Sequence, residues 1–170
     1  RRGTLGQIIL MGGAEYDGVA LDCLVAPGAR GAQVFNVTSR QNDLFDLLFT
    51  RFAPRTLNHH RPLSEGLGQH LRQAYDLPLD REDLTPLLRR RGVRLGPDTR
   101  RICHWSFYTR PGVLELYSEM LRNRHNWTIS ALKAEAGCLP QAARWSLLVP
   151  RLPWTPPDAG AGAVRPAAGT

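Results

Sequence analysis

The chain has 170 residues, 42% of them hydrophobic, which is enough for one domain with a buried core. Its 22 Lys and Arg residues outnumber 15 Asp and Glu residues, and this net charge of +7 permits binding to nucleic acid or an anionic surface without demonstrating it. Three cysteines without C-x-x-C spacing argue against a disulfide framework and a zinc site, and no apolar run approaches the length of a membrane span.

The first predicted element is a strand over residues 5–11, where the run LGQIILM is followed by two glycines. Such a run is typical of a strand that is buried on both faces, as in a parallel sheet. The acidic residues Glu15 and Asp17 follow this strand, and a short helix is predicted over residues 18–25. Asp17 would either line the edge of the sheet or cap this helix, and we favour the cap.

The segment 32–52 predicts a second strand, a turn and a second helix. Residues 33–38 alternate between apolar and polar side chains, as a strand does. After the turn at residues 39–43, leucine and phenylalanine side chains recur at helical spacing as far as Phe52. The order strand, helix, strand, helix indicates an α/β fold with a parallel sheet.

The segment that follows has no clean period. Residues 53–101 are rich in turn formers, so we expect a long excursion or lid-like insertion there. Within it, a short helix over residues 81–91 would be capped by Asp80, although Pro86 interrupts the pattern. Residues 100–108 are expected to form a short strand or a loop packed on the core.

Two further helices and a tail complete the prediction. Pro111 opens a helix over residues 112–124 with one apolar face, and a final helix is predicted over residues 127–136. The domain is therefore expected to span residues 1–149. Residues 150–170 are rich in Pro, Ala and Gly, and we expect them to form a disordered tail.

Asp43 and His104 are the candidate catalytic residues. A strand that delivers Asp43 to its carboxyl end, just before a helix, is how open parallel sheets build active sites. The same residue, or Asn42, would also serve as a helix cap. His104 lies between Cys103 and Trp105, either as a general base held by a carboxylate or as a histidine packed against backbone groups. On spacing alone, the helix cap and the packed histidine are the favoured interpretations.

The other charged and histidine residues point to a solvated surface. A run of arginines that could grip phosphate comprises Arg89, Arg90, Arg91, Arg94, Arg100 and Arg101. No aromatic residues alternate with them, as they do in proteins that bind single-stranded nucleic acid, so nucleic acid is not an expected partner. His59 and His60 lack the spacing of metal ligands on one helix face, and no carboxylate cluster accompanies them.

Three segments together resemble the C-terminal half of the α/β-hydrolase fold. They are GGAEYDGVAL at residues 12–21, VFNVTSRQND at residues 34–43 and ICHWSFYTRPGVLELY at residues 102–117. The chain is most similar to bacterial α/β hydrolases of unknown function, relatives of esterases and lipases, and the likeness covers residues 5–122. The family's serine-arginine-asparagine-aspartate turn matches Ser39, Arg40, Asn42 and Asp43 with Gln41 inserted, and its histidine-aromatic segment matches His104 and Trp105.

This resemblance implies a partial parallel sheet with flanking helices and a Ser-Asp-His triad. Asp43 would orient His104, His104 would accept the serine proton, and Asp46 is the alternative acid one turn later. The serine would lie in a G-x-S-x-G turn upstream of this chain, because a helical crossover needs about a dozen residues and only four precede residue 5. The resemblance thus implies that the chain alone is inactive.

The intact parent would hydrolyse a small-molecule carboxylic ester, and no metal or organic cofactor is expected. We also expect a cytoplasmic location and no membrane span. The competing hypothesis is a non-catalytic scaffold of the same fold, which would bind an anionic partner through its arginine-rich face.

Overall fold

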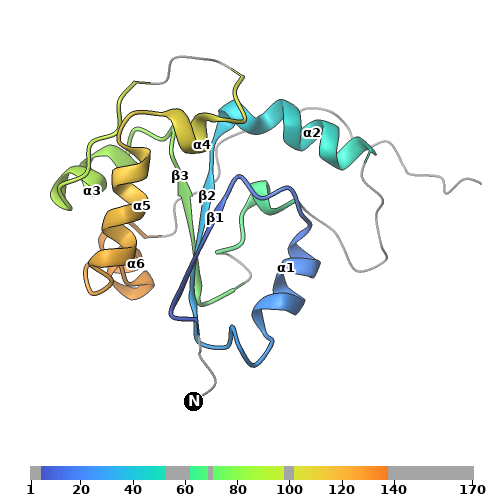
Figure 1. Ribbon diagram of the computed structural model, residues 1–170, viewed down its shortest axis with the longest axis horizontal. Helices are drawn as coiled ribbons and strands as arrows, with labels where there is room; N and C mark the ends of the chain where they lie inside the picture. Colours follow the sequence, from blue (N-terminus) through green and yellow to red (C-terminus); the bar gives the residue numbers. More distant parts are fainter. Residues whose placement is uncertain (1–4, 53–61, 69–70, 98–101, 138–170) are drawn as a thin grey trace, which may run out of the picture.

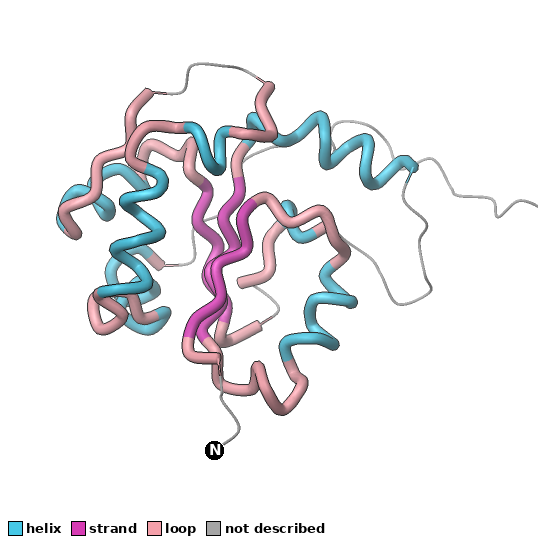
Figure 2. The backbone as a smooth tube through the Cα atoms, viewed as in Figure 1, coloured by secondary structure: helices cyan, strands magenta, loops and turns pink. Residues whose placement is uncertain are grey.

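The computed structural model describes residues 5–52, 62–68, 71–97 and 102–137 (Figure 1). Three parallel strands form one sheet, in the spatial order β1 (Gln7–Met11), β2 (Gln33–Thr38) and β3 (Ala74–Pro78). Figure 2 shows the three strands side by side in magenta. The two strands predicted from the first forty residues are confirmed.

Helices flank this sheet. In chain order they are α1 (Asp17–Leu24), α2 (Asp43–Phe52), α3 (Leu84–Arg90), α4 (Ser106–Thr109), α5 (Val113–Arg122) and α6 (Ile129–Ala136), with 3₁₀ turns η1 (Arg40–Asn42) and η2 (Leu63–Glu65). Helix α1 lies on one side of the sheet, and α3, α5 and α6 lie on the other (Figure 1). Helices α2 and α4 lie at the carboxyl end of β2. The architecture is α/β with a parallel sheet and flanking helices.

Strand β2 is the centre of the core. Its register places Phe35 between Ile9 of β1 and Tyr75 of β3. Because side chains alternate along a strand, Val34 packs into the layer beneath α1, whereas Phe35 and the next odd position pack into the opposite layer. The central strand β2 and strand β3 are buried along nearly their whole length, whereas β1 is partly buried throughout.

The two layers differ in size. The smaller layer joins α1, β2 and the segment around η2, and its buried members are Ala20, Leu24, Val34, Leu63, Leu67 and Ala74. The larger layer joins β2 and β3 to helices α3 to α6, and its largest fully buried side chains include Phe35, Tyr75, Phe107, Leu116, Met120 and Trp127. The helices that close this larger layer include those predicted over residues 112–124 and 127–136, which are confirmed with slightly shorter bounds.

The structure corrects the prediction that residues 53–101 form an excursion. Strand β3 lies within this segment and pairs with β2 along five positions. The sequence AYDLP conceals the strand, because Asp76 and Pro78 are residue types that strands disfavour. Pro78 occupies the last position of the strand, and the carboxylate of Asp76 is satisfied by neighbouring donors. The tail predicted at residues 150–170 lies outside the described residues.

The helix predicted over residues 81–91 exists in shortened form as α3. Asp83 occupies its N-cap position, so Pro86 is the third residue of the helix. A proline in the first turn removes no hydrogen bond, because the N–H groups there have no partner within the helix. The proline that weakened the prediction is therefore compatible with the helix.

Asp76 connects β3, β2 and the segment before β3. One carboxylate oxygen accepts hydrogen bonds from Asn36 Nδ2 and the Leu67 N–H, and the other accepts from the Gly68 N–H, each at 2.8 Å. Asn36 Nδ2 also donates to the Leu63 carbonyl at 2.8 Å. The Asp76 side chain is buried, so water could not serve as the acceptor for these donors if the carboxylate were removed.

Replacing Asp76 with alanine should lower the free energy of unfolding by about 3 kcal/mol, because three donors would lose their acceptor in a buried site. Urea denaturation of the purified protein measures this change. Asp22→Ala on the exposed face of α1 is the control, and it should change stability by less than about 1 kcal/mol. Equal losses in the two variants would contradict the structural role of Asp76.

A group of side chains connects α3 to α6. The carboxylate of Glu135 accepts from Arg90 Nε and pairs with Arg91 Nη1, the latter at 2.6 Å. The guanidinium of Arg91 also lies over the Trp127 ring, 5.4 Å from its centroid. Burial acts to raise the pKa of Glu135, but the hydrogen bonds from the two arginines outweigh it and lower that pKa below its ordinary value.

The stabilisation that Glu135 contributes should depend on pH. Because its pKa is lower in the folded state, the contribution is complete above the ordinary value of 4.5 and is lost as the pH falls through the folded-state pKa. At pH 7, Glu135→Gln should cost about 0.5–1 kcal/mol, since the pair is partly solvated. Urea denaturation at neutral and acidic pH measures the difference, with the exposed Glu115→Gln as a control. A cost that is the same at acidic as at neutral pH would contradict this assignment.

Candidate active site

The carboxyl end of β2 runs into a closed turn. Ser39 is the N-cap of η1, and its Oγ accepts a hydrogen bond from the Gln41 N–H at 3.2 Å. The Asn42 N–H donates to the Ser39 carbonyl at 3.1 Å. Helix α2 begins at the next residue, so the turn is held by a strand on one side and a helix on the other. Side chains of this turn therefore have fixed positions.

The segment before α4 is anchored to this turn. The Cys103 N–H donates to the Gln41 carbonyl at 2.8 Å, which brings the next residue, His104, beside η1. Nδ1 of His104 lies 2.7 Å from Oδ1 of Asn42. The imidazole is half-buried, and among the described residues no hydrogen-bond partner is present at its Nε2.

Asn42 is itself held by a carboxylate. Its Nδ2 donates to Oδ1 of Asp46 at 2.7 Å, across four residues of the turn and the first turn of α2. Asn42 is 3% exposed and Asp46 is 4% exposed. The three side chains form a continuous chain of short hydrogen bonds, from a buried carboxylate through a buried amide to a half-buried imidazole.

The structure corrects the expected contact between Asp43 and His104. The Nδ1 atom that Asp43 was expected to hold is bonded to Asn42 instead. Asp43 is buried as the first residue of α2, and one residue along a helix turns a side chain by about 100°. Positions 42 and 46 share one helix face, so an Asn-x-x-x-Asp spacing is the signal that could have identified this pair. The catalytic roles given to Asp43 and His104 stay predictions.

Aromatic and apolar side chains surround the imidazole. The ring centroids of Phe45, Trp105 and Phe107 lie 5.5, 6.0 and 6.2 Å from that of His104. Phe107 is fully buried, whereas Phe45 is 42% exposed and Trp105 is 65% exposed. One side of the imidazole is thus packed on the core, and the other is bordered by apolar surface open to solvent.

Phe107 also contacts the end of β1. Gly12 follows that strand with a φ of +58°, and a Cβ atom placed on it would lie 2.3 Å from the Phe107 ring. Both the backbone conformation and the close approach of the ring require glycine at this position. The Phe107 ring that packs beneath His104 is therefore positioned against the backbone at the end of β1.

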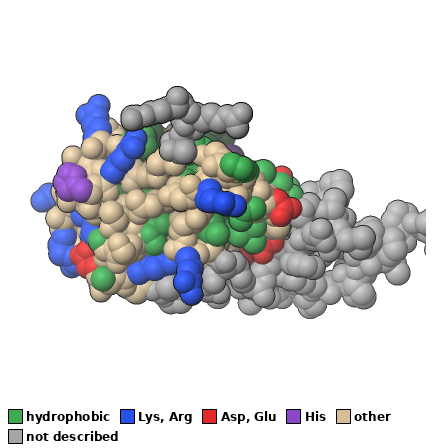
Figure 3. Space-filling view, turned by 90° about the horizontal axis from the view of Figure 1, so that it is seen from below, with side chains coloured by type: hydrophobic (Ala, Val, Ile, Leu, Met, Phe, Trp, Pro, Cys, Tyr) green, Lys and Arg blue, Asp and Glu red, His purple; other side chains and the backbone are tan. Residues whose placement is uncertain are grey.

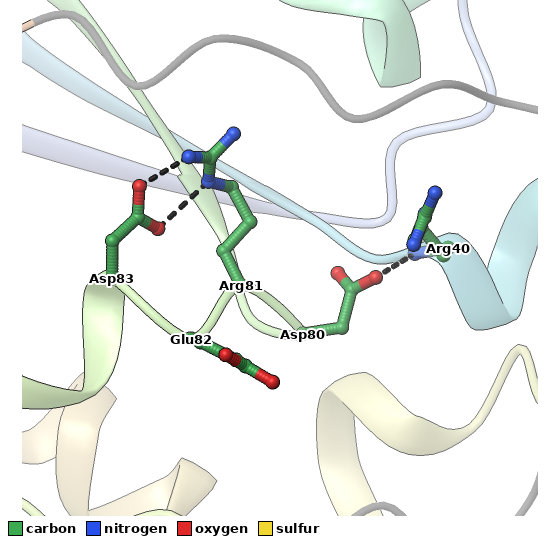
Figure 4. A pocket seen from close by; sticks show the side chains of 5 residues that line it. All are labelled: Arg40, Asp80, Arg81, Glu82 and Asp83. Atoms are coloured by element: carbon green, nitrogen blue, oxygen red, sulfur yellow. Dashed lines mark hydrogen bonds and ion pairs between the residues drawn. The ribbon is translucent and has the colours of Figure 1, made fainter.

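A surface pocket lies at the carboxyl ends of β2 and β3, lined by Arg40 and residues 80–83 (Figure 4). The Arg40 N–H donates to Asp80 at 3.1 Å, and the Arg81 guanidinium binds Asp83. The hydrogen bond from Arg81 lowers the pKa of Asp83 below its ordinary value. Within the pocket, Arg81 and Asp83 therefore pair with each other, whereas Asp80 accepts from a backbone N–H.

The other predicted features have structural roles or lie elsewhere. Tyr16, and not Asp17 as favoured, occupies the N-cap position of α1; Asp17 is the first residue of the helix and accepts from the Gly18 N–H at 2.8 Å. Arg90 and Arg91 are engaged by Glu135. Figure 3 shows Lys and Arg side chains dispersed over the face of the molecule that is seen from below the view of Figure 1. Other positions lie outside the described residues, namely His59, His60, His70, Arg100 and Arg101.

Comparisons with known proteins leave the family open. No protein-family model matches the chain, and no curated protein or solved structure matches it. The resemblance to α/β hydrolases therefore stays a prediction. In the ranges that the structure describes, no helix is long and apolar enough to cross a membrane, and no group of His, Cys, Asp and Glu side chains is arranged to hold a metal ion.

Proposed function

We propose that His104 is the general base of a hydrolase that cleaves carboxylic esters by acyl transfer. The observation that carries this proposal is the hydrogen bond between Nδ1 and the oxygen of a fixed, buried amide, while among the described residues Nε2 has no hydrogen-bond partner. A general base needs this combination of a fixed orientation and an open ring nitrogen. The position at the carboxyl end of a parallel strand, where α/β proteins bind ligands, supports the same interpretation.

The proposed reaction follows from the chemistry of imidazole. Nε2 accepts the proton of a hydroxyl group as the hydroxyl oxygen forms a bond to the ester carbonyl carbon. The resulting imidazolium then returns the proton to the alkoxide as the ester C–O bond breaks, which releases the alcohol and leaves an acyl enzyme. Water attacks the acyl carbon by the same route. We assign the hydroxyl group to a serine outside these 170 residues, as the resemblance implies.

The surroundings of His104 support an apolar group on one side of the ester. Phe45 and Trp105 expose their rings beside the imidazole, and Tyr108 is 40% exposed next to Trp105, with ring centroids 6.2 Å apart. Exposed aromatic rings around a catalytic group favour contact with alkyl or aryl parts of a substrate. By contrast, two arginines of the alternative anion-binding face are already engaged by Glu135.

The test uses the complete gene product that contains these residues, assayed with p-nitrophenyl esters of increasing acyl length. His104→Ala should lower kcat about 10²–10⁴-fold, which is the usual contribution of a general base. The control is His125→Ala, which removes an exposed imidazole in the turn before α6 and should leave kcat unchanged. Absence of turnover in the unmodified protein, or equal turnover in both variants, would overturn the proposal.

A further inference from the structure

The hydrogen bonds around Asn42 determine which way its amide points. An ionised carboxylate only accepts hydrogen bonds, whereas an amide group donates through its nitrogen and accepts through its oxygen. Asp46 therefore requires that the Asn42 nitrogen face it, as the 2.7 Å contact from Nδ2 to Oδ1 shows. The amide oxygen is then the atom that faces His104, at 2.7 Å from Nδ1.

The orientation of the amide in turn determines where the imidazole carries its proton. An amide oxygen has no hydrogen to donate, so Nδ1 of His104 must be the donor in this contact. In a neutral imidazole the other nitrogen then holds the lone pair. We infer that Asp46 is a positioning residue that acts through Asn42 to fix the tautomer of His104, with the proton on Nδ1 and the lone pair on Nε2.

Burial makes this control effective. Asn42 and Asp46 are both almost fully buried, so water cannot easily replace either partner or stabilise the reversed amide. If the carboxylate were absent, the amide could rotate by 180° and donate to Nδ1 through its nitrogen. The imidazole proton would then lie on Nε2, the atom that the proposed function needs as a base. Only the role of Nε2 as a base rests on the proposed function, because the tautomer follows from the contacts alone.

This arrangement differs from the triad that the resemblance implies. There a carboxylate contacts the imidazole directly and the expected residue is Asp43. Here a neutral amide separates the imidazole from Asp46, so the carboxylate contributes by orienting a dipole. The structure thus assigns the orienting role to a position four residues after Asn42, and it predicts different effects for two neighbouring buried aspartates.

Long-range ¹H–¹⁵N correlation spectra of histidine-labelled complete gene product test this inference at a pH where the imidazole is neutral. The His104 signals are assigned by their absence from the His104→Ala variant. In the unmodified protein, Nδ1 should have the shift of a protonated ring nitrogen and Nε2 that of an unprotonated one. The opposite pattern, or a mixture of tautomers, would overturn the inference without any variant.

The matched variants are Asp46→Asn and Asp43→Asn, which change two similarly buried carboxylates by the same atoms. Asp46→Asn should move the His104 nitrogen shifts towards a mixture of tautomers, and Asp43→Asn should leave them unchanged. A shift in Asp43→Asn alone would overturn the inference. Thermal unfolding of each variant shows whether the fold is retained. An inactive protein with the expected tautomer would remove the proposed function and leave the inference standing.

Discussion

The carboxylate of Asp76 is the interaction on which the rest of the structure depends. It lies in the middle of β3, yet its hydrogen bonds reach sideways to Asn36 of β2 and back to the segment around residues 67–68. Strand β3 is held beside β2 by this contact as well as by the ladder of backbone hydrogen bonds. Without β3 the larger core layer would lose one wall, and helices α3 to α6 would have less surface to pack on.

The same pairing of amide and carboxylate occurs at the candidate site. Asn36 donates to Asp76 inside the sheet, and Asn42 donates to Asp46 just beyond the end of β2. In both pairs the asparagine also makes a second contact, to a carbonyl in the first case and to an imidazole in the second. Asn36 makes both contacts by donating from Nδ2, whereas Asn42 donates from Nδ2 and faces the imidazole with Oδ1. Strand β2 and its turn therefore organise both the fold and the site.

The sequence predicts the parts of this fold that depend on periodicity. Strands β1 and β2 and helix α5 have apolar patterns that their burial explains, and the structure confirms them. Strand β3 was missed because the local sequence pattern does not show that the Asp76 carboxylate accepts hydrogen bonds from residues elsewhere in the chain. At the candidate site, the predicted partner of His104 was off by one residue: position 43 was expected to face the imidazole, but position 42 does. A one-residue shift along a tight turn depends on dihedral angles that composition and spacing do not encode.

The contact between Gly12 and Phe107 constrains how this sequence can change during evolution. A side chain at position 12 would require the aromatic ring at position 107 to be lost first, so the order of two substitutions matters. The same ring packs 6.2 Å from the imidazole of His104. A smaller residue at position 107 would leave a cavity beneath the site before any gain at position 12. Substitutions at position 12 and at the candidate site are therefore coupled through a single aromatic ring.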